Sequence, residues 1–221
     1  MKITWCGHAT FLLEGNGTRI VTDPYTPEVA GYDPITEPVD IVIMSSATDR
    51  FHSCADMVAG DPVVINALDI TETGAEVKGI QFSSVPAMES IVHKSDPDQN
   101  AMYRFGVEDI EIGHMGDVGN PLSETQLEFF KGVDILLALT GGPPTIELND
   151  LDEVIDAIQP KVTIPMHYRT DKVTLTRILP VDDFTTRYPA ELVHYQGQSQ
   201  IEVNQSNLPK TNQIYVLDYA N

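Results

Sequence analysis

The first half of the chain carries short apolar segments that predict β-strands. Met1–Trp5, Thr10–Glu14 and Arg19–Thr22 are apolar or alternating runs. Gly15-Asn16-Gly17, between the last two, predicts a hairpin turn because Asn and Gly readily adopt left-handed backbone. Val39–Met44 is a continuous apolar run, which is typical of a strand buried on both faces. Further strands are expected at Pro62–Ala67, Gly79–Val85 and Met102–Val107.

The second half alternates strands with helices. Leu122–Lys131 has apolar residues at helical spacing and Ser123 as a candidate N-cap. Asn149–Ile158 predicts an amphipathic helix with an acidic first turn. Strands are expected at Ile110–Ile112, Val133–Leu139 and Val162–Pro165, with two or three more after Glu191. This order predicts layered sheets with helices outside, in one domain over residues 1–221.

The charge balance limits the classes of partner. The chain has 33 acidic and 13 basic side chains and a formal charge of −20, which argues against nucleic-acid or anionic-membrane partners because phosphate contact needs clustered Lys and Arg. Cys6 and Cys54 are too few for a disulfide framework and are expected to be free thiols. Without a leader pattern at Met1 or an apolar run of membrane-spanning length, a cytoplasmic protein is expected.

Polar residues gather just past the ends of the expected buried strands. The six histidines are His8, His52, His93, His114, His167 and His194. None lies two or four residues from another, so the sequence holds no local metal-binding signature. However, His114 and Asp117 follow one strand, His167 follows another, and the segment Ser45–His52 follows Val39–Met44. Sites in α/β-type proteins are commonly built at such strand ends.

Five segments carry a family resemblance, in order and over residues Met1 to about Tyr219. They read WCGHATFLLEG, IVTDPY, IGHMGDVG, VDILLALTGGPPTI and PKVTIPMHYRT. Together they resemble the metallo-β-lactamase superfamily, specifically its small bacterial branch related to L-ascorbate-6-phosphate lactonase. The resemblance implies an α+β fold, a four-layer αββα sandwich with its site at the strand ends along one edge.

The resemblance also implies a dinuclear zinc site in active members. Its first part is a strand followed by Thr-His-x-His-x-Asp-His, and a loop His, a bridging Asp and a final His complete the set. The metals would lower the pKa of a bridging water so that it attacks at neutral pH. Asp117 matches the bridging Asp and His167 the final His.

The first metal motif departs from the family pattern. Aligned on the strand Asp40–Met44, the chain has non-matching residues at all four ligand positions: Ser46, Thr48, Arg50 and Phe51. A register shifted by one would place Asp49 on the second His and His52 on the last, at the cost of misplacing the strand. Glu89 stands at the loop His, with His93 nearby as a substitute.

Arg50 suggests what replaces the metals. A guanidinium is permanently charged and cannot coordinate a cation, so an Arg50 that points into the site would pair with Asp117, with Glu89 as a second partner. An exposed Arg50 on a loop is the other interpretation. The first reading predicts a degenerate site, with no metal cofactor and zinc hydrolysis lost. Such a protein would bind a small polar or phosphorylated ligand.

A second hypothesis keeps hydrolysis. A mononuclear site, with one zinc or other divalent ion, or a metal-free acid–base pair would then act on a sugar-phosphate lactone or similar small ester. Asp117, His167 and Glu89 would be its catalytic or metal-binding residues, with His93 or His52 as substitutes for Glu89. Residues expected to line or brace the site in either case are His8, Asp23, Ser46, Thr48, Arg50, His114 and Tyr168. Asp23 is expected to accept backbone N–H bonds from the Ser45–Arg50 loop. The sequence leaves the oligomeric state open.

Overall fold

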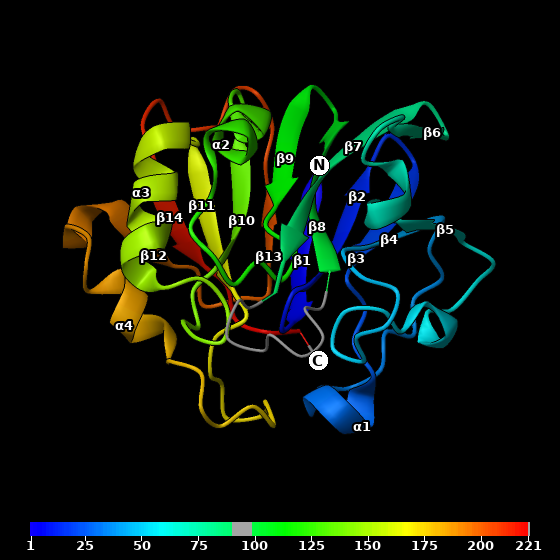
Figure 1. Ribbon diagram of the computed structural model, residues 1–221, viewed down its shortest axis with the longest axis horizontal. Coiled ribbons are helices and arrows are strands. Elements are labelled where there is room, and N and C mark those ends of the chain that lie inside the picture. Colours follow the sequence, from blue (N-terminus) through cyan, green and yellow to red (C-terminus); the bar gives the residue numbers. More distant parts are fainter. Residues whose placement is uncertain (90–98, 221) are drawn as a thin grey trace.

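Two β-sheets stacked face to face form the body of the protein in the computed structural model, which describes residues 1–89 and 99–220 (Figure 1). The first sheet has the strand order β13-β1-β2-β3-β4-β5. Its strands are β1 (Lys2–Gly7), β2 (Thr10–Gly15), β3 (Thr18–Thr22), β4 (Ile41–Met44), β5 (Val63–Asn66) and β13 (Gln200–Glu202). The strands β1 to β3 pair antiparallel, whereas β3, β4 and β5 are parallel.

The second sheet has the order β12-β14-β11-β10-β9-β8-β7-β6. Its strands are β6 (Ala75–Val77), β7 (Ile80–Met88), β8 (Gln99–Val107), β9 (Ile110–His114), β10 (Ile135–Leu139), β11 (Val162–Met166), β12 (Val193–Tyr195) and β14 (Gln213–Val216). The strands β9, β10 and β11 are parallel neighbours in its centre. Every side chain of β10 is buried, as its continuous apolar sequence predicts.

The hairpin and both longer helices predicted from the sequence are confirmed. Asn16 and Gly17 connect β2 to β3 with φ angles of 51° and 74°. The helix α2 (Glu124–Phe130) begins after Ser123, whose side chain and that of Gln126 form a reciprocal capping box. The helix α3 (Leu148–Ile158) turns Leu148, Leu151, Val154, Ile155 and Ile158 toward the core.

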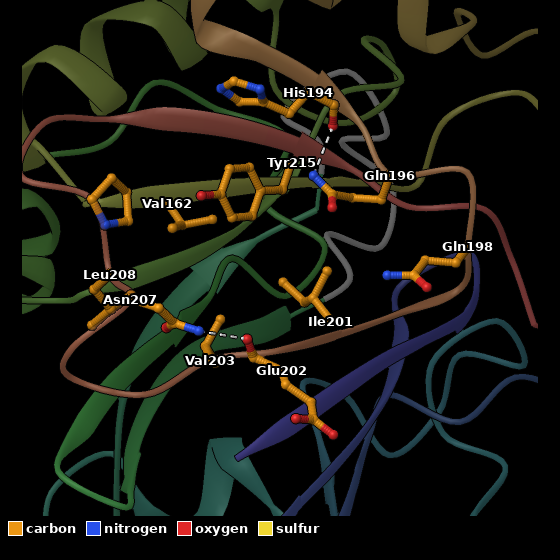
Figure 2. A pocket seen from close by; sticks show the side chains of 11 residues that line it. Val162, His194, Gln196, Gln198, Ile201, Glu202, Val203, Asn207, Leu208 and Tyr215 are labelled. Atoms are coloured by element: carbon orange, nitrogen blue, oxygen red, sulfur yellow. Dashed lines mark hydrogen bonds between the residues drawn. The ribbon is translucent and has the colours of Figure 1, made fainter.

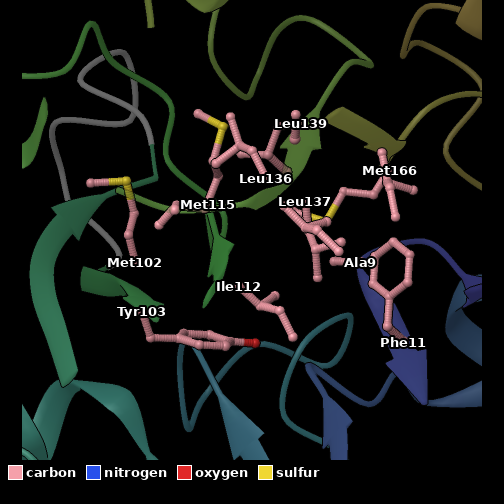
Figure 3. Close-up of a cluster of buried hydrophobic side chains, with 14 of the residues drawn as sticks. Ala9, Phe11, Met102, Tyr103, Ile112, Met115, Leu136, Leu137, Leu139 and Met166 are labelled. Carbon is pink, nitrogen blue, oxygen red and sulfur yellow. The ribbon is translucent and has the colours of Figure 1, made fainter. Parts of the chain in front are cut away.

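The main core lies between the two sheets (Figure 3). Phe11 of β2 meets residues of the second sheet there, among them Ile112 of β9 and Leu137 of β10. Each of these three side chains is fully buried. A smaller cluster covers the other face of the first sheet, where Val21 and Val42 pack against Tyr25 and Tyr32.

The outer layers confirm the sandwich but are unequal. The helices α2 and α3 pack against each other and against the second sheet (Figure 1). The outer layer on the first sheet is mostly loop, with the four-residue α1 (Pro27–Ala30). Four prolines between residues 24 and 38 explain this difference, since proline in a helix interior removes a hydrogen bond and clashes with the preceding turn. The five-residue α4 (Val181–Thr185) lies beyond β11.

The ends of β4, β9 and β11 and the turn between β1 and β2 bring together the polar residues singled out in the sequence. Among the described residues, no helix has both the length and the apolar character to cross a membrane. The cysteines are free, with Cys6 buried and Cys54 half-buried.

Candidate metal centre

Four buried side chains from four separate segments meet at this edge. His8 lies in the turn between β1 and β2, His52 in the loop after β4, Asp117 after β9, and His167 directly after β11. The first two are fully buried, and His167 and Asp117 are 3% and 5% exposed. His8, Asp117 and His167 lie within three residues of a strand end, so the sheets fix their backbone, whereas His52 lies eight residues after β4 in a loop.

These residues form two groups of metal-donor atoms. In one group, His8, His52 and His167 each offer a nitrogen, and the donor atoms lie within 4.8 Å of one another. The other group is formed by Asp49, His52 and Asp117 with the same spacing. The rings of His8 and His167 have their centroids 4.0 Å apart. His52 belongs to both groups.

Several donor atoms of this cluster lack hydrogen-bond partners although they are buried. They are both ring nitrogens of His8, Nε2 of His52, Nδ1 of His167 and Oδ1 of Asp117. Unpartnered buried polar atoms are costly, and each one in a native protein calls for an explanation. A bound cation would account for one nitrogen of each histidine and for the Asp117 oxygen, because each of these atoms can offer a lone pair.

The distances within the cluster also fit a metal ion. His52 Nε2 lies 3.6 Å from Asp117 Oδ2 and 3.7 Å from Asp49 Oδ2, and His167 Nε2 lies 3.5 Å from Asp117 Oδ1. These separations are too long for good hydrogen bonds. They are close to the separation of about 3.3 Å between atoms that bind one zinc ion tetrahedrally at about 2.0–2.1 Å. The donor set therefore fits the metal that the fold implies.

Asp23, at the end of β3, fixes the orientation of His52. Its carboxylate accepts hydrogen bonds from the backbone N–H of Ser45 at 2.7 Å, from the Ser45 hydroxyl at 2.7 Å and from the Tyr103 hydroxyl at 3.0 Å. It also lies 2.9 Å from Nδ1 of His52, which leaves Nε2 facing the cluster. The expectation that Asp23 braces this loop is confirmed. A carboxylate behind a ligating histidine is the usual way to fix the ring and its tautomer.

Burial and charge set the protonation of the three histidines. Burial lowers the pKa of His8 well below its usual range, and the neighbouring His167 and His52 lower it further. Burial also lowers the pKa of His167 to about 4, against the opposing effect of Asp117. Burial would lower the pKa of His52 too, but the carboxylates of Asp117, Asp23 and Asp49 outweigh it and raise the pKa to about 10. His8 and His167 are therefore neutral at pH 7, with lone pairs available to a metal.

Three residues of this region have left-handed backbone although none is glycine. The φ angles are 50° for His8, 37° for Asp23 and 55° for His167. His167 N–H also donates to the His8 carbonyl at 2.9 Å, so the two strand ends hold each other. Left-handed non-glycine residues cost free energy and concentrate at functional sites. The clustering of three here is a second indication of function that the sequence alone does not reveal.

The predicted role of Arg50 as a replacement for the metals is wrong. Its side chain is exposed, and within the described residues it forms no ion pair with Asp117 or with another carboxylate. The reason lies in the tight turn from Asp49 to His52, where the His52 N–H donates to the Asp49 carbonyl at 3.1 Å. This turn directs residues three apart to the same side, so Asp49 and His52 face the cluster and Arg50 lies at the outside. The shifted register agrees with the structure at these two positions.

Ser46 and Thr48, which stand at the first two ligand positions of the motif, belong to neither donor group. Ser46 is buried with its hydroxyl 3.3 Å from that of Thr48, and Thr48 is exposed at the pocket that opens over the cluster. Glu89 lines the same pocket and belongs to neither of the two donor groups found among the described residues. The candidate His93 lies outside the described residues.

His114 and Tyr168 are buried and contact backbone groups and core side chains. His114 is fully buried, with Nε2 2.9 Å from the Ala9 carbonyl and Nδ1 accepting from the Gly116 N–H. Tyr168 is also buried, with its ring tilted by 34° against that of Trp5 and its hydroxyl donating to the Leu217 carbonyl. Neither is among the residues that line the pocket over the donor groups.

Two cavities differ sharply in their chemistry. The pocket over the donor groups has a volume of about 1070 Å³, and Asp49, His52, Asp117 and His167 all reach its wall. A second cavity of about 400 Å³ lies by β12, β13 and β14 (Figure 2). His194 lines it without a second histidine or a cysteine among the described lining residues. Of these two cavities, the larger one has the metal-donor side chains in its wall.

Comparisons with known proteins identify the family of the chain. The family model described as a β-lactamase superfamily domain matches residues 2–167, which include all five donors. A UPF0173 protein of Pyrococcus furiosus is 29% identical over 182 residues, covering 77% of this chain and 84% of its own. A UPF0173 metal-dependent hydrolase of Methanopyrus kandleri is 24% identical over 195 residues, covering 77% of this chain and 85% of its own.

The solved structures add a similar protein over nearly the whole chain. A crystal structure from Thermotoga maritima, described as a candidate zinc-dependent hydrolase of the metallo-β-lactamase superfamily, is 32% identical. It covers 98% of this chain and 97% of its own, with a TM-score of 0.77. None of these three relatives is described as a lactonase.

The prediction of a degenerate site that only binds a ligand is therefore wrong. The donor groups are present, with Asp49, His52 and His8 beside Asp117 and His167, and relatives are described as metal-dependent hydrolases. The family match covers residues 2–167, and the structural similarity extends over 98% of the chain. This chain belongs to the metallo-β-lactamase superfamily.

Proposed function

We propose that this protein is a hydrolase that uses one divalent metal ion, zinc by the chemistry of its ligands, to cleave a small ester or lactone. The observation that carries the proposal is the buried group His8, His52 and His167, in which each ring has a nitrogen without a hydrogen-bond partner. Imidazole suits Zn²⁺, and catalytic zinc commonly has three protein ligands and one open position. The ester or lactone bond follows from the resemblance of the sequence to the lactonase branch.

His52 limits the site to one ion. Its Nδ1 lies 2.9 Å from Asp23, so Nε2 is the nitrogen left for a metal. Both donor groups depend on His52, and a single lone pair binds a single ion. The two groups therefore compete, and together they hold one ion per chain.

Asp117 is suited to handle the proton of the reaction. When bound, the metal supplies Lewis-acid activation that makes a water molecule nucleophilic at neutral pH. The Asp117 carboxylate reaches the pocket wall, 3.5 Å from His167 Nε2 and 3.6 Å from His52 Nε2, and would accept and hold the proton released there. The pocket volume of about 1070 Å³ admits a small molecule.

Hydrolysis assays on protein stripped with a chelator and reloaded with zinc test the proposal. With 4-nitrophenyl acetate and δ-valerolactone as probes, the zinc-loaded protein is expected to be active and the stripped protein inactive. Asp117→Asn is expected to lower kcat/KM by about 100-fold, the usual scale of general acid–base catalysis. His52→Ala removes a donor shared by both groups and should abolish zinc-dependent activity.

His194→Ala is the matched control, because His194 is exposed and lies outside the pocket over the donor groups. This variant should keep the activity of the unmodified protein. Full activity in the chelator-stripped protein, or equal activity in the His52→Ala and His194→Ala variants, would contradict the proposal.

A further inference from the structure

Two arginines line the pocket over the donor groups. Arg50 lies in the loop after β4, and Arg177 lies in the segment between β11 and α4. Both side chains are exposed, and within residues 1–89 and 99–220 neither forms an ion pair. They reach the same pocket as His52, Asp117 and His167 from different parts of the chain.

Unpaired cations are unusual elsewhere in this strongly acidic protein. Twelve of its Lys and Arg residues lie in the described part of the chain, and eight of those form ion pairs with carboxylates. The eight are Lys2, Arg19, Lys78, Arg104, Lys131, Lys161, Lys172 and Arg187. With a net charge of −20, most exposed cations find an acidic partner. Two of the other four, Arg50 and Arg177, line the pocket over the donor groups.

The pocket has the chemistry to bind an oxyanion beside the reacting bond. A guanidinium presents a planar set of donors that matches the two oxygens of a carboxylate or phosphate. Thr48 and Thr176 line the same pocket, and their hydroxyls can donate further hydrogen bonds. Since the whole chain repels anions, an anionic substrate needs such local positive charge to enter.

We propose that Arg50 and Arg177 bind an anionic substituent of the substrate, a phosphate or a carboxylate, at a distance from the bond that is cleaved. That a bond is cleaved at the donor groups rests on the proposed function. Three carboxylates that line the pocket, Asp49, Asp117 and Glu147, form no ion pair with either arginine. Arg50 thus has a role at the pocket mouth, outside the metal group.

Anion binding by the chelator-stripped protein tests the arginines independently of catalysis. Inorganic phosphate and succinate serve as probes, and isothermal titration measures their affinities. We expect at least one probe to bind. Arg50→Gln and Arg177→Gln should each lower the affinity for that probe by about tenfold, the usual contribution of a charge-assisted hydrogen bond. The preferred probe distinguishes a phosphate substituent from a carboxylate. Lys210→Gln is the control, because it removes one exposed, unpaired charge outside the pocket.

Two results would overturn the proposal: no binding of either probe to the unmodified protein, or equal binding by the Arg50→Gln/Arg177→Gln double variant and Lys210→Gln. A second experiment compares zinc-loaded hydrolysis of 4-nitrophenyl acetate, which is neutral, with 4-nitrophenyl hemisuccinate, which carries a carboxylate. We expect the ratio of their kcat/KM values, anionic over neutral, to fall about tenfold in each arginine variant and to stay unchanged in Lys210→Gln. An unchanged ratio in the double variant would also overturn the proposal. If neither ester is cleaved, the proposed function fails, and the titrations still decide the role of the arginines.

Discussion

Asp23 joins three separate segments of the chain through one buried carboxylate. Its oxygens accept from Ser45 and Tyr103 and lie 2.9 Å from the ring of His52. Burial alone would raise the pKa of Asp23, but His114, His52 and Ser45 outweigh it and lower the pKa. The carboxylate is therefore ionised, and it orients a ring that both donor groups need.

Asp23→Asn should weaken metal binding more than it weakens the fold. The amide keeps an acceptor for the Ser45 N–H but loses the charge that holds the His52 ring and its tautomer. Substitution behind a ligating histidine costs about 10–100-fold in metal affinity. Competition for zinc against a chromophoric chelator measures the loss. Asp33→Asn, which breaks an exposed ion pair with Lys172, is the control and should bind zinc normally. Equal zinc affinities in the two variants would refute this role.

The two thiols should react at very different rates. Burial raises the pKa of Cys6 to about 12, so almost none of it is thiolate at pH 8, while Cys54 is half-buried. Alkylation of the native protein with iodoacetamide at pH 8, followed by peptide mass spectrometry, should modify Cys54 first. Both residues should react in guanidinium chloride. Rapid modification of Cys6 in the native protein would contradict the burial described for β1.

At the scale of elements, apolar patterning predicts the interior well and the outer layer poorly. The apolar run at β10 and the capping signal at Ser123 each identify one element, because burial or a local hydrogen bond fixes the structure there. The three-residue β6 has no apolar run and depends on pairing with β7. Such a strand forms because of tertiary contacts, which the local pattern of apolar residues does not predict.

The end of β10 must approach the end of β11 closely. A Cβ atom on Gly141 would lie 2.0 Å from the carbonyl oxygen of His167, which is backbone and has little freedom to move. Gly141→Ala should therefore destabilise the protein by about 3 kcal/mol, the upper range for overpacking a well-packed region. It should also displace His167 and lower zinc content.

Gly132→Ala is the control that separates the effect of this clash from the free-energy cost of a left-handed backbone. Gly132 has a φ angle of 81°, and a Cβ atom there would meet nothing within 4 Å. Its substitution should cost about 1 kcal/mol from left-handed backbone alone, with zinc content unchanged. Urea unfolding of the chelator-stripped proteins gives both values. Equal destabilisation by the two substitutions would show that the approach at Gly141 is not as close as described.

At the scale of the whole molecule, the donor groups connect the two sheets. His8 and His52 follow strands of the first sheet, whereas Asp117 and His167 follow strands of the second. A bound ion therefore cross-links the sandwich at one edge, and ligand binding to the folded state alone stabilises it. At a free zinc concentration 100 times the dissociation constant, the gain should be about 2.7 kcal/mol.

Urea unfolding with and without buffered zinc measures this gain. The unmodified protein should gain stability with zinc, and His52→Ala should gain little or none. If zinc stabilises the variant as much as the unmodified protein, the ion does not bind at this cluster.

The sequence predicts part of this centre, and the reason for the limit is geometric. Asp117 and His167 follow buried strands whose ends are fixed. Their match to family ligands therefore predicts where the two side chains lie. His52 lies in a loop whose path depends on the bonds from Ser45 to Asp23 and on the turn from Asp49. A one-residue difference in that path decides whether Arg50 or His52 faces the site. His8 reaches the cluster through a left-handed turn that no local sequence pattern predicts.

Zinc content per chain tests the central claim most directly. Protein purified without chelator, loaded with zinc and passed through gel filtration is analysed by inductively coupled plasma mass spectrometry. The donor geometry predicts about one zinc ion per chain in the unmodified protein and in Arg50→Gln, and close to none in His52→Ala. Absence of zinc from the loaded protein, or two ions per chain, would contradict a single ion held through His52.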